Sequence, residues 1–188
     1  MQAAHIAALI AWRANQRGDR LGGLVAHHQG HVEIKPRSRQ AGVLHYLPAL
    51  VQGQKDAQST QQKADYFADA CARLRRLSRP GSAVYIISDF QSLDAQAQQH
   101  LTQLSRHCEL TAIQVTDPLE LNLPQSKQTL AVTDGNQRRW VQLNNARDYR
   151  HQAEQTQQSI HAALVKSHVR QLNLTTANLL EQQLSGQI

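Results

Sequence analysis

Apolar positions along the chain follow two patterns, one typical of buried strands and the other of amphipathic helices. The clearest strand signal is the apolar run from Ala83 to Ile87, which lies between a Pro-Gly break and the polar start of a helix. This composition predicts a strand that is buried on both faces. Residues 109–116 form a second apolar run. Between the two runs, Leu93, Ala97, Leu101 and Leu104 recur at helical spacing and predict a helix over 92–108.

The first part of the chain contains two further helices and a pair of strands. Apolar residues at helical spacing predict a helix that begins near residue 3 and ends at Gly18, the usual terminating residue. Two short strand-like runs, 21–28 and 31–36, are separated by a turn, and Pro36 closes the second. A short helix is expected from residue 41, with Gly53 ending it.

A long helix over 61–79 follows the polar loop at 54–60, and either Ser59 or Thr60 can cap it. Its expected end is the break at Pro80 and Gly81.

The last third of the chain begins with an Asp-Gly turn between two alternating segments, which predicts a hairpin over 129–143. A long helix is expected over 146–167 and a strand over 169–174. A final helix over 177–184 has Thr175 or Thr176 as its cap.

Strands that alternate with helices of this length predict an α/β sandwich whose sheet is mainly parallel. The chain has 188 residues, of which 40% are hydrophobic and 18% charged, and this suits one globular domain with a sizeable core. No internal repeat or linker divides it. We therefore expect residues 1–188 to form a single domain, with a hairpin extension at about 127–144.

Three polar residues directly follow predicted strands and are the candidates for a binding site. Asp89, Asp117 and Thr175, or its neighbour Thr176, would all lie along the carboxyl edge of a parallel sheet, where α/β proteins bind ligands. Aspartate is also common at this position for a structural reason, because it accepts hydrogen bonds from free backbone N–H groups at a helix start. The pattern leaves both interpretations open.

Charge and cysteine content narrow the class of protein. The formal net charge of +6 permits nucleic acid or an anionic surface as a partner. Cys71 and Cys108 lie far apart and form neither a zinc-ribbon nor a disulfide pattern, which favours a reducing, cytoplasmic compartment. No apolar run approaches the ~20 residues that span a bilayer. We expect no membrane segment in this chain.

Two other clusters have structural and functional interpretations. A group of histidines could bind Zn²⁺, Ni²⁺ or Cu²⁺, which imidazoles suit. Glu33 is the only carboxylate near this group, however, so a surface turn is its favoured interpretation. A run of arginines could bind phosphate, but arginines near a helix end also complement the helix dipole. The histidines are His27, His28 and His31, and the basic residues are Arg73, Arg75, Arg76 and Arg79, joined by Lys35, Arg37 and Arg39.

Catalytic signatures are absent from the sequence. It contains no GxSxG, HExxH, P-loop or GxGxxG motif, and neither cysteine has a base nearby in the sequence. Asp89 and Asp117 could form a carboxylate pair, but nothing identifies a substrate. We expect the protein not to be an enzyme.

Four phrases, in their order and spacing, resemble the family called domain of unknown function 58. They are "GDRLGGLV", "VEIKPRS", "RLRRLSRPGSAVYIISDF" and "DPLELNLP". The resemblance covers nearly the whole chain. It implies a von Willebrand factor A-like, doubly wound, mostly parallel sheet with helices on both faces, from a family usually encoded beside a MoxR-type ATPase.

The resemblance also implies a metal-ion-dependent adhesion site at the top edge of the sheet. Asp89 matches the aspartate that follows the fourth strand of that family's fold, and Thr60, or Ser59 beside it, stands where the threonine would be. The DxSxS motif that follows the family's first strand has no counterpart. Mg²⁺ prefers six oxygen ligands, so we expect no cofactor, and Mg²⁺ only if the missing strand is supplied.

The missing first strand is the central one of the family's sheet. We therefore expect the chain to be an N-terminally incomplete piece of a longer protein, in which the family's membrane-spanning segments and first strand lie upstream. In this interpretation "LGGLVAH" and "AVYIISD" either face a gap or pair directly. The function implied is a non-catalytic protein-interaction and assembly module acting with a MoxR-type ATPase. The alternative is nucleic-acid binding through the basic surface.

Overall fold

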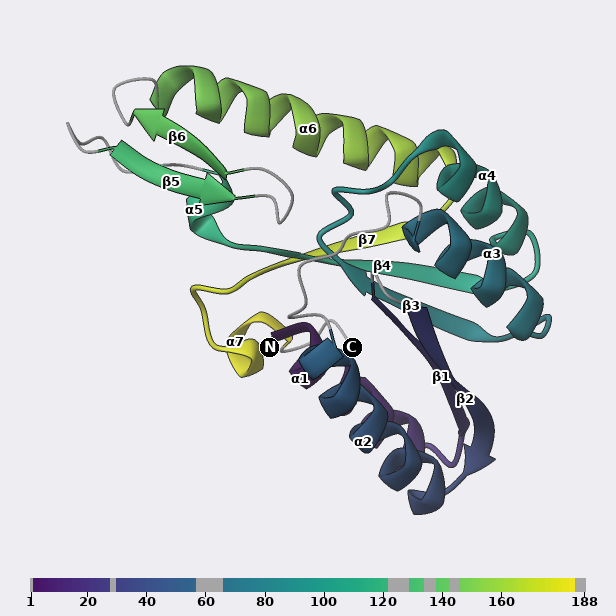
Figure 1. Cartoon of the computed structure of the whole chain (residues 1–188). Coiled ribbons are helices and arrows are strands. Elements are labelled where there is room, and N and C mark those ends of the chain that lie inside the picture. The colour runs from purple at the N-terminus through teal and green to yellow at the C-terminus, as the bar shows by residue number, and fades with distance from the viewer. Residues whose placement is uncertain are drawn as a thin grey trace.

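The structure, a computed structural model, describes residues 2–27, 30–56, 66–121, 129–133, 138–142 and 146–184. Its strands form three separate sheets in a mixed α/β fold (Figure 1). β1 and β2 pair antiparallel, β3, β4 and β7 form a parallel sheet in the order β3-β4-β7, and β5 and β6 form an antiparallel hairpin. The strands are β1 (Arg20–His27), β2 (Gly30–Ser38), β3 (Ala83–Ser88), β4 (Glu109–Thr116), β5 (Thr129–Thr133), β6 (Arg138–Gln142) and β7 (Arg170–Thr175).

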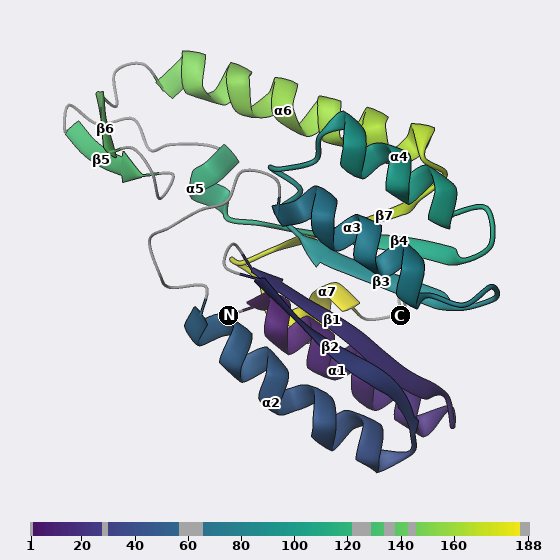
Figure 2. The same cartoon turned by 45° about the vertical axis from the view of Figure 1, so that its right-hand side comes forward.

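Helices cover both faces of the parallel sheet. Side chains of α3, α4 and α6 pack in one apolar cluster with β3 and β4, and α1 and α7 contribute to a second cluster with β4 and β7. Figure 2 shows α1 and α2 next to each other beside the β1–β2 pair. The helices are α1 (Gln2–Gln16), α2 (Gln40–Asp56), α3 (Tyr66–Leu77), α4 (Ala95–Leu104), α5 (Pro118–Leu121), α6 (Ala146–Lys166) and α7 (Leu180–Leu184).

β4 is the central strand of the parallel sheet and the most buried one. Its side chains alternate between the two clusters, so that Leu110 and Ala112 face α3 and α4 while Ile113 faces α1. Ala112 and Ile113 are fully buried, as is Leu101 of α4. Each large apolar side chain buried in this way contributes roughly 1.5–3 kcal/mol to folding.

Gly18 ends a helix as predicted, and Asp94, which was not predicted as a cap, begins another. Gly18 has φ of 79°, a left-handed conformation that glycine adopts without strain, and it follows the last turn of α1. Asp94 is the N-cap of α4, with its carboxylate accepting a hydrogen bond from the Ala97 N–H at 2.7 Å. The predicted hairpin, the helix at 146–167 and the strand at 169–174 are likewise confirmed.

The prediction that Gly53 ends a helix is wrong. α2 continues to Asp56, and Gly53 lies inside it. A Cβ atom at position 53 would lie 2.4 Å from Cγ1 of Val25 on β1. Gly53 therefore allows α2 to pack closely on β1. The sequence pattern alone does not distinguish this role from that of a glycine that ends a helix.

The predicted burial of β3 on both faces is also wrong. Only Val84 of this strand is buried, and Tyr85 is 37% exposed. β3 pairs with β4 on one side, and within the described residues no strand pairs with its other edge. β1 and β3 are not paired directly, so the expected single sheet is divided. Their carboxyl ends lie close together and the strands diverge toward their amino ends (Figures 1 and 2).

The β5–β6 hairpin lies beside the first half of α6, away from the parallel sheet (Figures 1 and 2). Whether residues 1–188 behave as one domain stays a prediction. No helix in the described part of the chain is long and apolar enough to cross a membrane.

Candidate functional site at the carboxyl edge of the sheet

Asp89 follows β3 directly and organises the loop that leads to α4. Its Oδ1 accepts a hydrogen bond from the Gln91 N–H at 3.1 Å, and Ser88 Oγ accepts one from the Phe90 N–H at 3.1 Å. Phe90 has φ of 58° and is 1% exposed, so this tight turn places its ring in the core. Asp94, not Asp89, caps α4. Asp89 thus supports the turn, while its side chain stays exposed.

A network of uncharged amides holds this loop against the sheet. Gln114 of β4 is 1% exposed, and its Nε2 donates to the Asp89 carbonyl at 3.1 Å and to Gln157 Oε1 of α6 at 2.9 Å. Gln171 of β7 donates from Nε2 to Gln114 Oε1 at 2.8 Å. His161 Nδ1 lies 2.7 Å from Gln171 Oε1 and extends the network. A buried amide with all these partners fixes the relative positions of the loop, the sheet and α6.

Asp117 follows β4 and joins it to the end of β7. Its Oδ1 accepts from the Leu119 N–H at 2.9 Å, and its Oδ2 accepts from Thr176 Oγ1 at 2.8 Å. These two hydrogen bonds, the backbone one first, hold the pKa of Asp117 below its usual value. Of the two threonines left open by the sequence, Thr176 therefore contacts Asp117.

Thr175 faces a different neighbourhood. Its N–H donates to Gln183 Oε1 at 2.8 Å, and its carbonyl accepts from Gln183 Nε2 at 3.0 Å and from Gln2 Nε2 at 3.1 Å. These bonds join the end of β7 to α7 and α1. Thr175 lies at the predicted edge, but its backbone bonds to glutamines and its Oγ1 accepts from the Ala177 N–H at 3.3 Å, and neither Asp89 nor Asp117 is among these partners.

A third carboxylate, Glu120 of α5, lies within electrostatic range of both aspartates. Loss of water around its carboxyl group raises the pKa of Glu120, and the charges of Asp89 and Asp117 raise it further, although a hydrogen bond from the Asp117 backbone acts in the opposite direction. Burial raises the pKa of Tyr66 on α3, and Asp89 adds to this effect, while a hydrogen bond with Ser92 opposes it. The edge is therefore acidic, in contrast to the positive net charge of the chain.

These carboxylates do not form a metal cage. Among the described residues, no group of three or more His, Cys, Asp or Glu side chains is arranged to hold a metal ion. Thr60, which the sequence paired with Asp89 as a metal ligand, lies outside the described residues. Asp89 alone supplies too few of the oxygens that Mg²⁺ requires.

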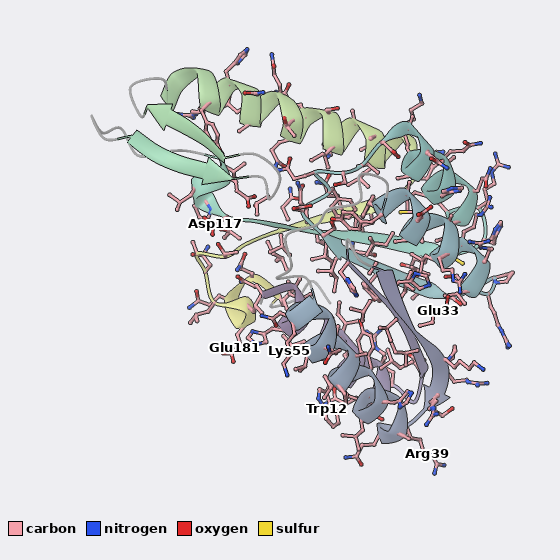
Figure 3. All side chains as sticks on the ribbon, in the orientation of Figure 1. Trp12, Glu33, Arg39, Lys55, Asp117 and Glu181 are labelled. Carbon is pink, nitrogen blue, oxygen red and sulfur yellow. The ribbon has the colours of Figure 1, made fainter. Side chains whose placement is uncertain are left out.

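Exposed leucines accompany the carboxylates. Leu119 is 59% exposed and lies two residues after Asp117, and Leu179 is 67% exposed and precedes α7. Asp117, directly after β4, and Glu181, on α7, lie on the same side of the molecule in the view of Figure 3. The edge thus presents negative charge and apolar surface together.

The histidine and arginine clusters lie elsewhere, with Glu33 well away from Asp117 in Figure 3. Arg73 of α3 contacts Glu33 of β2, and His31 Nε2 lies 3.5 Å from Glu33 Oε1. The hydrogen bond from Arg73 is the largest cause of the lowered pKa of Glu33. Glu33 therefore joins α3 to β2 by an ion pair. His28 is outside the described residues.

The sequence analysis did not identify Gln114 or Glu120 as site residues. It named Thr176 only as an alternative to Thr175. A usable signal existed for Gln114, because a glutamine in the apolar run "ELTAIQVT" must find buried partners. Glu120 had no such signal, since its surroundings depend on how α5 docks.

The family described as Protein of unknown function DUF58 matches residues 1–163. The chain belongs to this family. A search of the curated proteins found no match. The fold resembles the crystal structure of conserved hypothetical protein BatB from Bacteroides thetaiotaomicron, with a TM-score of 0.57 and 15% sequence identity over 97% of this chain and 83% of that one.

An aerotolerance-related membrane protein from Bacteroides fragilis, solved with multiple mutations to serines, has a TM-score of 0.48 and 11% identity over 88% of each chain. The BatB likeness supports a mixed α/β fold for this DUF58 member. It carries no information on the reaction or the partner.

Proposed function

We propose that this DUF58 chain is a von Willebrand A-type, non-catalytic module that binds protein partners at the carboxyl edge and acts with a MoxR-type ATPase in the assembly of a complex. The observation that carries the proposal is the combination of carboxylates and exposed leucines at this edge. Apolar side chains surrounded by polar ones are typical of protein-binding surfaces. The ATPase partnership and the von Willebrand type rest on the sequence resemblance described above.

The edge residues have suitable chemistry for a protein partner with basic and apolar side chains. Asp117 is charged at neutral pH as an ordinary aspartate is, and its hydrogen bonds lower its pKa further. Leu119 and Leu179 offer apolar area that binding would remove from water, at about 25 cal/mol per Å². The amide network around Gln114 holds the Asp89 loop in place, so little ordering is needed on binding.

The proposal places the module in the cytoplasm and gives it no resident cofactor. Cys71 and Cys108 are both free thiols, which suits a reducing compartment. Mg²⁺ would bind only if a further segment supplied the missing ligands.

Binding of the purified 188-residue chain to a MoxR-type ATPase from the same organism, measured by biolayer interferometry at ~0.15 M and ~0.5 M salt, tests this proposal. We expect Leu179→Ser to weaken binding at least about tenfold, or ~1.4 kcal/mol, because a central apolar contact is lost. Leu44→Ser, at a similarly exposed leucine of α2, is the matched control and should bind like the wild type.

Two results would contradict the proposal. One is equal loss of binding in the edge and control variants. The other is binding to mixed-sequence DNA with an affinity that falls steeply with salt, which would support the alternative of a nucleic-acid partner at the basic residues.

A further inference from the structure

Exposed apolar side chains lie on the outer side of α1 and α2, the two helices that stand next to each other beside the β1–β2 pair (Figure 2). Leu9 and Trp12 of α1 are 47% and 39% exposed, and Leu44 and Val51 of α2 are each 56% exposed. Leu44 and Val51 are about two helical turns apart, so they lie on one side of α2. α1 packs on β1 and β3 and α2 packs on β1 and β2, so the exposed side chains of both helices point away from the strands. These four side chains form the α1–α2 face.

Positive charge is concentrated in the same part of the chain. Residues 1–20 and 34–56, which include both helices and the adjoining strand ends, contain seven Arg and Lys residues against two Asp residues. The rest of the chain contains thirteen Arg and Lys residues against twelve Asp and Glu residues. Nearly all of the formal net charge of +6 therefore belongs to the segments that carry the α1–α2 face. This asymmetry directs a negatively charged partner to that side of the molecule.

Pairing of β1 with β2 gathers four arginines where α1 ends and α2 begins. Arg20 begins β1 and is paired with the end of β2, Arg17 lies between α1 and β1, and Arg39 lies between β2 and α2. All four side chains are exposed, and they form the arginine cluster: Arg17, Arg20, Arg37 and Arg39. In the view of Figure 3, Trp12 lies between Arg39 and Lys55, so cations lie toward both ends of the α1–α2 face.

An apolar helix face with cations at its ends has the chemistry that binds an anionic lipid surface. Leucine and valine side chains enter the boundary between headgroups and acyl chains, and tryptophan favours the level of the headgroups. Guanidinium groups bind phosphates through paired hydrogen bonds. Nucleic acid would use the arginines but would gain little from exposed leucine and valine, because most of its contacts are to charged phosphates. The combination of the two kinds of side chain therefore favours lipid.

We infer that the α1–α2 face binds the surface of a bilayer that contains anionic lipids, with both helices in the plane of the headgroups and the arginine cluster on the lipid phosphates. The binding is peripheral, because the apolar side chains reach only the outer part of the acyl region and no described helix is long and apolar enough to cross a bilayer. Asp117 of the carboxyl edge lies well away from Trp12 in Figure 3. The inference does not depend on the proposed function, which concerns that edge.

Sedimentation of the full chain with sucrose-loaded vesicles tests the inference. The probes are vesicles of phosphatidylcholine alone and vesicles that also contain ~30% phosphatidylglycerol, both at ~0.1 M salt. We expect the partition coefficient to be at least about tenfold higher for the anionic vesicles and to fall as the salt concentration rises. In a Trp140→Phe chain, Trp12 is the only tryptophan, and its emission should shift to shorter wavelength when anionic vesicles are added.

A double variant measures the apolar contribution to lipid binding. Leu44→Ser combined with Val51→Ser should lower the partition coefficient at least about tenfold, because the aliphatic side chains no longer enter the bilayer. Leu77→Ser combined with Val165→Ser is the matched control, at an exposed leucine of α3 and an exposed valine of α6, and should bind like the wild type.

A second double variant measures the contribution of the arginine cluster. Arg17→Gln combined with Arg39→Gln should lower the partition coefficient on anionic vesicles at least about tenfold. Its matched control is Arg76→Gln combined with Arg106→Gln, at exposed arginines outside the two basic segments, which should leave binding unchanged. Circular dichroism checks that all four variants are folded.

Four results would overturn the inference. The first is a folded chain that does not sediment with the anionic vesicles, or that binds both kinds of vesicle equally. The second is equal loss of binding in a double variant and its matched control. The third is loss of binding in the arginine variant alone, without a shift in Trp12 emission, because the surface would then bind polyanions such as nucleic acid in general. The fourth is a chain that forms a dimer through Leu44 and Val51 and binds no lipid, because a second copy would then cover the face.

Discussion

Replacing Gly53 by alanine should destabilise the protein, although alanine is the better helix former. In the interior of α2, alanine is favoured over glycine by about 1 kcal/mol. Against this gain, the new Cβ would lie 2.4 Å from Val25 Cγ1, about 1 Å closer than the ~3.5 Å at which carbon atoms make favourable contact. Valine has few accessible rotamers, so its methyl group cannot turn away freely.

The size of the effect follows from these two opposing contributions. Overpacking of this kind costs about 1–3 kcal/mol, and a stiff neighbour favours the upper half of that range. Subtracting the helix gain leaves a net loss of about 1–2 kcal/mol. For a chain of this length, that loss lowers Tm by about 2–8 °C.

Urea denaturation followed by far-UV circular dichroism measures this loss, and a double-mutant cycle with Val25→Ala identifies its cause. Removing the Val25 methyl groups should abolish the clash. In the V25A background, Gly53→Ala should therefore be neutral or stabilising by up to about 1 kcal/mol. A Gly53→Ala single variant that is more stable than wild type would refute the argument that close packing selects this glycine.

Three further predictions concern the amide network, the Asp117 pair and the buried thiol. Gln114→Leu removes three hydrogen bonds at similar volume and should lower the unfolding free energy by about 2–4 kcal/mol in urea; an unchanged midpoint would contradict this. The pKa of Asp117 is lowered in the folded state, so its contribution to stability is present at neutral pH and is lost as pH falls through the folded pKa. Thr176→Val should accordingly lower Tm at pH ~7 but not at pH ~2, and an equal shift at both values would show that the hydroxyl acts through packing. Burial, with a smaller contribution from the charge of Asp94, raises the pKa of Cys71 to about 12, so iodoacetamide should not label Cys71 in the native chain at pH ~8 but should label it in urea. Native labelling at the unfolded rate would contradict this.

Local signals were sufficient for most of the helices and strands. Ala97, Leu101 and Leu104 of α4 have helical spacing, so the helix and its buried face could be predicted from the sequence, whereas its cap, Asp94, was not singled out. Gly18 and Gly53 show where such signals stop being decisive. Both are glycines near the end of an apolar helical pattern, but only the position of Val25 in the fold distinguishes packing from termination.

The part of the candidate site that depends on the alignment of the carboxyl ends of parallel strands could be predicted from the sequence. Asp89 and Asp117 follow neighbouring parallel strands, and alignment of carboxyl ends is a property of any such sheet. The sequence left Thr176 open as an alternative to Thr175. Adjacent residues of an extended chain point in opposite directions, and the sequence alone does not show which of the two faces Asp117. Glu120 could not be found, because its raised pKa arises from the docking of α5 near residues distant in the sequence.

The groups that hold the Asp89 loop are amides, which do not titrate. An ion pair at the same place would come apart in acid and weaken in high salt, whereas the bonds from Gln114 to the Asp89 carbonyl and to Gln157 are indifferent to both conditions. Asp117 and Glu120 can therefore gain or lose protons while the Asp89 loop stays attached to β4 and α6 through these amides. Any acid sensitivity of partner binding would then report on the side-chain charges themselves and not on the collapse of their support.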